Sequence, residues 1–234
     1  MRSLGKLTGC LIVACLVAAG CRTDAGQEPR GPSTAAPGGH SSSPVDPDRL
    51  KARTQARLDQ DRRARGAVLD ETALADLRLQ VETPMGAGGD ALSPCRPVLA
   101  SNQKTIGGYV ASWKRPDASL RLEQYVVAYG TDEPSPEATA ALAEVRDSLT
   151  CKEHRTREGR LTLTGTTPLP EYPGVADRLA FCERIDDGPR TTCTVLLARG
   201  DLLSKVRVVA PTQSAATEAL SQLAAAAARA LVKP

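Results

Sequence analysis

The sequence predicts an α+β domain in which helices flank a mainly antiparallel sheet, with two disulfides. Three observations lead to this fold class: strand-like segments follow one another through short turns, amphipathic helix-like segments lie between and after them, and four cysteines follow an apolar N-terminal run. The 234 residues are enough for one domain with tails. The net charge of +3 gives no electrostatic case for binding nucleic acid.

The first 20 residues have the features of a signal peptide. Arg2 and Lys6 form a short positive region, and residues 7–19 form an uncharged apolar run that is shorter than the about 20 residues of a membrane-spanning helix. The run ends in VAAGC at residues 17–21, which resembles the lipobox of bacterial lipoproteins. The resemblance implies that residues 1–20 are removed and that the thiol of Cys21 carries a diacylglycerol. An ordinary signal peptide is the alternative.

Cleavage at this point explains why the chain has an odd number of cysteines, seven in all. Cys10 and Cys15 leave with the signal peptide and Cys21 carries lipid, although Cys15 is a second candidate for lipidation that would leave a very short apolar run. An even number of cysteines in an exported chain indicates disulfides. The four that remain are Cys95, Cys151, Cys182 and Cys193.

Two segments separate the signal peptide from the folded domain. Residues 21–47 are rich in Gly, Pro, Ser and Thr and hold no leucine, isoleucine or aromatic residue, so we expect a disordered linker that holds the domain off the membrane. Residues 48–66 are compatible with a helix and carry seven basic residues against three acidic ones. A solvated charged helix is the simpler interpretation, and contact with anionic lipid headgroups is the alternative.

Residues 67–234 are expected to form the folded domain. Before the first strand we predict a helix over residues 69–77, a turn or loop at 86–89 and a short helix over 91–100 that carries Cys95. Two strands follow, over residues 109–114 and 119–129, and the turn at 115–118 joins them. The second strand alternates: Leu120, Leu122, Val126 and Ala128 lie on one face, and Arg121, Glu123 and Tyr125 lie on the other.

A helix then begins after Ser135, which is a suitable N-cap, with Pro136 at the first helical position. It ends near Cys151. The remaining segments are predicted as strands over residues 161–166, 176–185, 191–199 and 202–210 and a final helix over 212–232.

The hairpin between residues 176–185 and 191–199 indicates one disulfide. Its loop is centred on residues 187–188, and Pro189 cannot close a hydrogen-bonded two-residue turn, so we predict a four-residue loop over 186–189. In that register Cys182 and Cys193 form a non-hydrogen-bonded pair with Cα atoms about 4.5 Å apart, which a disulfide can span. Cys95–Cys151 is then the remaining pair.

The region from about residue 67 to residue 232 resembles the PknH-like extracellular sensor domain of actinobacteria. The shared features are Cys95 after a short helix, Leu-Thr-Cys ending in Cys151, Cys182 after a phenylalanine, and Cys193 in a strand that runs into the sequence LARGD. The resemblance covers about 70% of the chain. It implies two disulfides in this order, an antiparallel sheet flanked by helices, and a cleft for an extracellular ligand. It supplies no ligand residues.

No catalytic residue, cofactor or metal site is predicted. Residues 101–104 match S-x-x-K, but the other motifs of penicillin-binding enzymes are absent, as are the kinase motifs, so any sensing would be relayed by a partner or end at binding. The chain has no C-x-x-C motif, and His154 is the sole histidine after residue 66. Disulfides therefore explain the cysteines better than a metal site does.

The six aromatic residues are unevenly distributed, because Tyr109, Trp113, Tyr125 and Tyr129 all lie on the first predicted strand pair. They are candidates for the floor of a ligand cleft, and packing under the helices is the alternative.

Three functions remain open from the sequence. The first is a membrane-anchored, non-enzymatic, extracytoplasmic binding or sensor module for an unknown small extracellular ligand. The second is a structural or assembly lipoprotein that contacts another envelope protein, which a flat apolar patch would favour. The third is an exported hydrolase of unrecognised type, which convergent titratable groups would favour.

Overall fold

The computed structural model describes residues 46–89, 93–95, 98–130, 137–156, 159–186 and 188–233. The predicted signal peptide, Cys21, almost all of the predicted linker, and the cap at Ser135 and Pro136 lie outside these residues.

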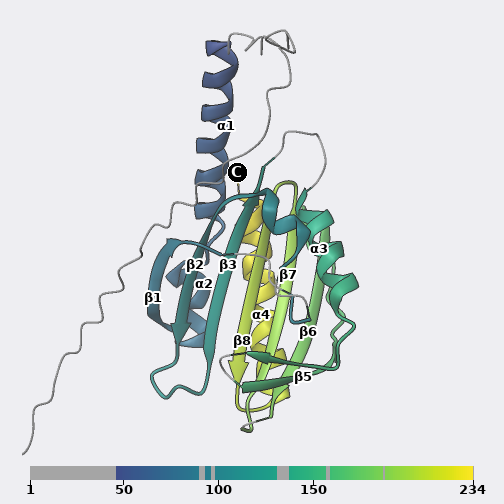
Figure 1. The fold of residues 1–234 in the computed structure, drawn as a ribbon. Coiled ribbons are helices and arrows are strands. Elements are labelled where there is room, and N and C mark those ends of the chain that lie inside the picture. The colour runs from purple at the N-terminus through teal and green to yellow at the C-terminus, as the bar shows by residue number, and fades with distance from the viewer. Residues whose placement is uncertain are drawn as a thin grey trace, which may run out of the picture. The chain divides into compact units, whose positions relative to one another are not determined.

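The chain forms helices and strands in the order that Figure 1 shows. The α-helices are α1 (Pro47–Gly66), α2 (Glu71–Leu74), α3 (Glu137–Ser148) and α4 (Gln213–Val232), and the 3-10 helices are η1 (Ala75–Leu77) and η2 (Ala100–Lys104). The strands are β1 (Gln80–Ala87), β2 (Thr105–Lys114), β3 (Arg121–Tyr129), β4 (Glu153–Thr156), β5 (Gly159–Thr166), β6 (Asp177–Ile185), β7 (Thr191–Arg199) and β8 (Leu202–Ala210).

Within the described residues, eight strands form one sheet in the order β1-β2-β3-β8-β7-β6-β5-β4, and every neighbouring pair is antiparallel. The predicted fold class is therefore confirmed. The last strand, β8, pairs with β3 and β7 in the middle of the sheet, so the N-terminal and C-terminal parts of the domain meet at the β3–β8 pair.

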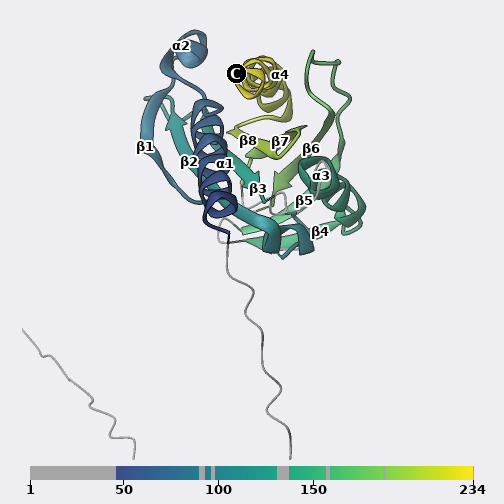
Figure 2. The same ribbon diagram turned by 90° about the horizontal axis from the view of Figure 1, so that it is seen from above.

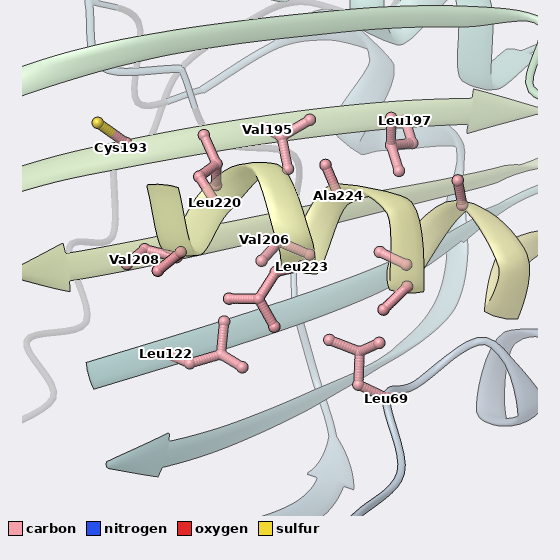
Figure 3. Packing of buried hydrophobic residues seen from close by; sticks show 14 of the residues in the cluster. Leu69, Leu122, Cys193, Val195, Leu197, Val206, Val208, Leu220, Leu223 and Ala224 are labelled. Atoms are coloured by element: carbon pink, nitrogen blue, oxygen red, sulfur yellow. The ribbon is translucent and has the colours of Figure 1, made fainter. Parts of the chain in front are cut away.

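Helix α4 covers one face of the sheet, where it contacts β7 and β8 (Figures 1 and 2). The Thr212 side chain caps this helix by accepting a hydrogen bond from the Ala215 backbone N–H. Leu220, Leu223 and Ala224 point from the helix toward the sheet (Figure 3). They meet the apolar side chains of three strands, which are Leu122, Cys193, Val195, Leu197, Val206 and Val208.

Helix α3 packs on the opposite face, against β6, β7, β8 and β3. Its Ala141, Leu142 and Val145 are fully buried against the Val127 and Leu203 side chains of the sheet. Because α3 has only 12 residues, it covers one end of this face and leaves the other end uncovered by a helix.

The C-terminal half of α1 belongs to the α4-side layer. Its Gln60 and Ala64 are buried, and the Gln60 amide donates a 2.5 Å hydrogen bond to the Tyr129 carbonyl. Arg63 makes a bidentate pair with Asp201, at 2.8 and 3.0 Å. Residues 46–58, by contrast, are all exposed, so half of this basic helix projects from the body of the domain (Figure 1).

Gln124 is a fully buried polar residue on the apolar α4-side face of β3. Its side-chain oxygen accepts a 2.7 Å hydrogen bond from the Leu69 backbone N–H, and its amide donates at 3.1 Å to the Ala67 carbonyl and to the Ser204 hydroxyl. One side chain thereby satisfies the backbone between α1 and α2 and fastens that connection to β3.

The β6–β7 hairpin has the predicted register. Ile185 donates to the Arg190 carbonyl at 2.9 Å, and Cys182 lies directly opposite Cys193 with a Cα–Cα distance of 4.1 Å. The Cys182–Cys193 and Cys95–Cys151 disulfides are both formed, so both predicted pairings are confirmed.

Three local predictions were wrong. The turn or loop predicted at residues 86–89 is wrong for residues 86 and 87, which are the last residues of β1. Every residue of this edge strand is exposed, so no alternating apolar pattern reveals it. The described residues 93–95 around Cys95 are not helical, and a 3-10 helix forms later, at η2. Strand β4 was missed because it has four residues, all polar.

Replacing Gln124 with leucine should lower the free energy of unfolding by about 1–3 kcal/mol, because the Leu69 N–H and the Ala67 carbonyl would lose their buried partner. Urea denaturation measures this change. The matched control is Gln222→Leu at an exposed position on α4, for which we expect a change within about 0.5 kcal/mol. Equal effects of the two substitutions would contradict the role assigned to Gln124.

Candidate functional site

The part of the sheet that α3 leaves uncovered holds a cavity of about 710 Å³, which we call the sheet pocket. Side chains of β3, β8, β7 and β6 form its floor, and β4, β5 and residues 93–95 form its rim. This volume is within the range of small-molecule sites, about 300–1,000 Å³.

The register of the sheet places the floor residues side by side. Tyr125 and Glu123 of β3 lie directly opposite Lys205 and Arg207 of β8. Residues that are directly opposite in an antiparallel pair point to the same face, so these four side chains all face the pocket. On the next strands, Thr194 lies opposite Arg207 and Phe181 lies opposite Thr194, and both also line the pocket.

The rim combines a hairpin with a segment tied down by a disulfide. His154 of β4 pairs with Leu161 of β5, and both line the pocket. Cys95 is bonded to Cys151, which follows α3, with a Cα–Cα distance of 5.5 Å. The Ser93 and Ser148 hydroxyls are also hydrogen-bonded to each other. The Cys95–Cys151 disulfide therefore holds one wall of the pocket against the end of α3.

The ionisable groups of the floor are largely buried and close to one another. Arg207 pairs with Glu123 at 3.3 Å, and both side chains are 15% exposed. The Lys205 ammonium lies 5.4 Å from the centre of the Tyr125 ring. The His154 Nδ1 atom lies 3.5 Å from a carboxylate oxygen of Glu183.

These surroundings shift two pKa values. Burial lowers the pKa of Lys205 to about 8, and the nearby Arg207 guanidinium adds to the shift, although the Glu183 and Glu123 carboxylates oppose it. Burial, followed by the charge of Arg207, also lowers the pKa of His154. The shifts indicate that the pocket destabilises additional positive charge.

The structure divides the four aromatic residues between the two faces of the sheet. Tyr109 and Trp113 lie opposite Val126 and Leu122 and therefore belong to the α4-side face. Trp113 is buried there, and the Tyr109 hydroxyl donates to Asp61 of α1 at 2.8 Å, which raises the pKa of Tyr109.

The other two aromatic residues face the α3 side. Tyr129 is fully buried in the apolar cluster under α3, whereas Tyr125 lines the sheet pocket. One of the four candidates thus reaches the pocket, and they do not form a common floor.

Sequence reasoning did not select the charged residues that line the sheet pocket. One signal for them was present: Lys205 and Arg207 are two charged residues at alternate positions of a strand whose other residues, apart from Ser204, are apolar. In a central strand such an interruption places both charges on one face. The alternation of the second predicted strand also placed Glu123 on the same face as Tyr125, although it did not indicate a pocket. Glu183 and His154 carry no comparable pattern, because the tertiary fold alone brings them to the site.

Two further features were searched for in the described part of the chain. No group of three His, Cys, Asp or Glu side chains in the ranges given above is arranged to hold a metal ion. No helix among those residues is long and apolar enough to cross a membrane.

Comparisons with known proteins support the fold. No family model and no curated protein matches the chain. Among solved structures, the extracellular domain of PknH from Mycobacterium tuberculosis is similar with a TM-score of 0.50 and 13% sequence identity, over 73% of this chain and 93% of that one. An Rv0999 ortholog from Mycobacterium smegmatis matches with a TM-score of 0.38 and 11% identity, over 69% of this chain and 96% of that one. The first similarity supports a PknH-like fold for this chain.

Replacing both Cys95 and Cys151 with serine should lower the free energy of unfolding by about 4 kcal/mol, because the disulfide closes a loop with a sequence separation of 56 residues. Chemical denaturation of the double variant and the parent measures this difference. A loss below about 1 kcal/mol would contradict the contribution to the free energy of unfolding that is assigned to the disulfide.

Proposed function

We propose that this chain is a membrane-anchored, extracytoplasmic lipoprotein that acts without catalysis and binds a small ligand in the sheet pocket. The observation that carries the proposal is the pocket itself, a cavity of about 710 Å³ on one face of the sheet whose lining combines charged side chains with apolar ones. A concave site of this volume in which polar groups lie beside apolar side chains is typical of small-molecule binding. The extracytoplasmic location is supported by the two disulfides.

The arrangement of exposed apolar side chains favours this function over assembly with an envelope protein. Among the described residues, large apolar side chains are exposed on α1, β1, β2 and the segment before η2, which are Leu50, Leu58, Val81, Met85, Val98 and Ile106. Two of them lie on α1, two on β1, and one each on β2 and the segment before η2. A few exposed apolar residues on several elements are ordinary features of a protein surface, whereas an interface needs a large contiguous patch.

The anchor would act through Cys21, the linker and α1. The exposed residues 46–58 of α1 span about 20 Å at the helical rise. With the Gly- and Pro-rich segment before them, they would hold the pocket away from the bilayer while keeping the domain tethered.

Ligand binding is tested by a ligand-detected NMR screen of charged and neutral small molecules against the mature chain in a non-ionic detergent. Thr156→Trp places an indole at an exposed residue of the pocket rim, and we expect it to abolish the binding of screen compounds that the parent binds. Thr72→Trp, at an exposed residue of α2, is the matched control and should bind them as the parent does. The proposal fails if no compound binds the parent, or if the bound compounds also bind Thr156→Trp.

Lipid anchoring is tested by replacing Cys21 with alanine and measuring the protein in the membrane and soluble fractions. We expect Cys21→Ala to move the protein out of the membrane fraction, because the thiol that accepts the lipid is gone. Cys15→Ala should leave it in the membrane, since Cys15 lies in the part that is removed. Unchanged membrane retention of Cys21→Ala would refute the anchor, and release by Cys15→Ala would move it to that residue.

A further inference from the structure

We propose that the sheet pocket takes an amphipathic small molecule whose acidic group, a carboxylate or a phosphate, lies beside Lys205 and Arg207. This inference rests on the proposed function, because it names the chemical class of the ligand for the same pocket.

Cationic side chains reach the pocket from two strands. Lys205 and Arg207 are two residues apart on β8, which lies in the middle of the sheet between β3 and β7. Both side chains line the pocket. Arg155 of β4 lines the same pocket from its rim, so cationic groups reach the cavity from two separate elements.

The pocket lining holds more cationic than anionic side chains. Three cationic side chains, those of Lys205, Arg207 and Arg155, line the pocket together with two carboxylates, those of Glu123 and Glu183. Glu123 pairs with Arg207 at 3.3 Å and also with Arg121 at 3.0 Å, which lies outside the lining and pairs in turn with Glu82 at 2.8 Å. The lining therefore has one cationic side chain more than it has carboxylates, with the exposed Arg155 at the rim, and an anionic group would neutralise this formal surplus.

Keeping the Lys205 ammonium protonated in the pocket costs free energy. Its pKa of about 8 means that Glu183 and Glu123 do not offset the burial of the ammonium and the repulsion from Arg207. An anion beside Lys205 would stabilise the protonated form. A neutral or cationic ligand would leave this cost in place or increase it.

The pocket lining also contains apolar side chains, which the rest of the ligand would contact. Pro94 and the Tyr125 ring are partly exposed in the lining, next to Leu161 and Phe181, which their protein neighbours already bury. An acidic group alone would leave these surfaces without a partner. A molecule with both an acidic group and an apolar body fits both parts of the cavity.

The affinity for an acidic ligand should depend on pH. An anion that stabilises the charged Lys205 raises its pKa, so binding takes up a proton when Lys205 is neutral. Between about pH 7 and pH 8 the affinity should therefore change little, and it should fall as pH rises above the pKa of about 8. The groups that face Lys205 are Glu123 and Tyr125 from β3, Arg207 from β8, Glu183 from β6, and His154 and Arg155 from β4. The lowered pKa of His154 keeps it neutral in this range, so it does not produce this decrease.

The test uses three probes with the mature chain in a non-ionic detergent: phenyl phosphate, inorganic phosphate and phenol. Isothermal titration calorimetry between about pH 7 and pH 9.5 measures their affinities. We expect phenyl phosphate to bind more tightly than either of its two parts. Its affinity should fall by up to about ten-fold per pH unit above about pH 8.

Four variants decide whether Lys205 is responsible. Lys205→Met should weaken phenyl phosphate binding by about ten-fold or more at pH 7, and Lys205→Arg should keep binding but remove its decrease above pH 8, because arginine stays charged. Arg155→Gln changes an exposed residue of the rim, so it tests the anion site without altering the core, and it should weaken binding several-fold. The matched control Lys51→Met removes a lysine on α1 that is 80% exposed and should have no effect.

Failure of this inference can be distinguished from failure of the proposed function. If phenol binds as tightly as phenyl phosphate, or if Lys205→Met and Arg155→Gln both bind normally, the acidic group is refuted. A compound whose binding Thr156→Trp abolishes would still support a ligand pocket in that case. If neither the three probes nor any screen compound binds the parent, both proposals fall.

Discussion

The register of β6 against β7, which the Cys182–Cys193 bond makes permanent, is the constraint on which the rest of the structure depends. Side chains alternate between the two faces of a strand, so a shift of one residue would exchange the faces. Phe181 and Glu183 would turn toward α4, and Cys182 would leave the apolar cluster. The bond joins strands in which both cysteines are buried under α4. It therefore fixes which face receives the helix and which forms the pocket.

The two faces differ because two helices of unequal length cover them. Helix α4, with 20 residues, takes the face where β3, β7 and β8 present apolar side chains, and Gln124 fastens the α1–α2 connection beside it. Helix α3, with 12 residues, covers part of the other face. In the uncovered part the side chains are charged and largely buried, and burial, with a further contribution from the Arg207 guanidinium, lowers the pKa of Lys205 to about 8. The same asymmetry thus creates the cavity and its electrostatic character.

The sequence was informative where a local physical rule decides the structure. Strands β7 and β8 were predicted with their observed bounds, and Pro189 with the Asp-Gly pair was sufficient to pair Cys182 with Cys193. Local sequence patterns did not predict β1 and β4, which are exposed edge strands without apolar alternation. The site was harder to predict than the strands, because Glu123, Lys205 and Glu183 become neighbours only through the β3–β8 and β6–β7–β8 pairings. Residues far apart in the chain meet there, and no local pattern encodes their meeting.

The most direct measurement of the central claim is peptide mapping of the non-reduced protein by mass spectrometry. The claim is that one strand register determines both faces of the sheet. It requires a peptide that joins Cys182 to Cys193 and a second that joins Cys95 to Cys151. Finding Cys182 joined to Cys95 or Cys151 would contradict the register, and with it the position of Phe181 and Glu183 in the pocket.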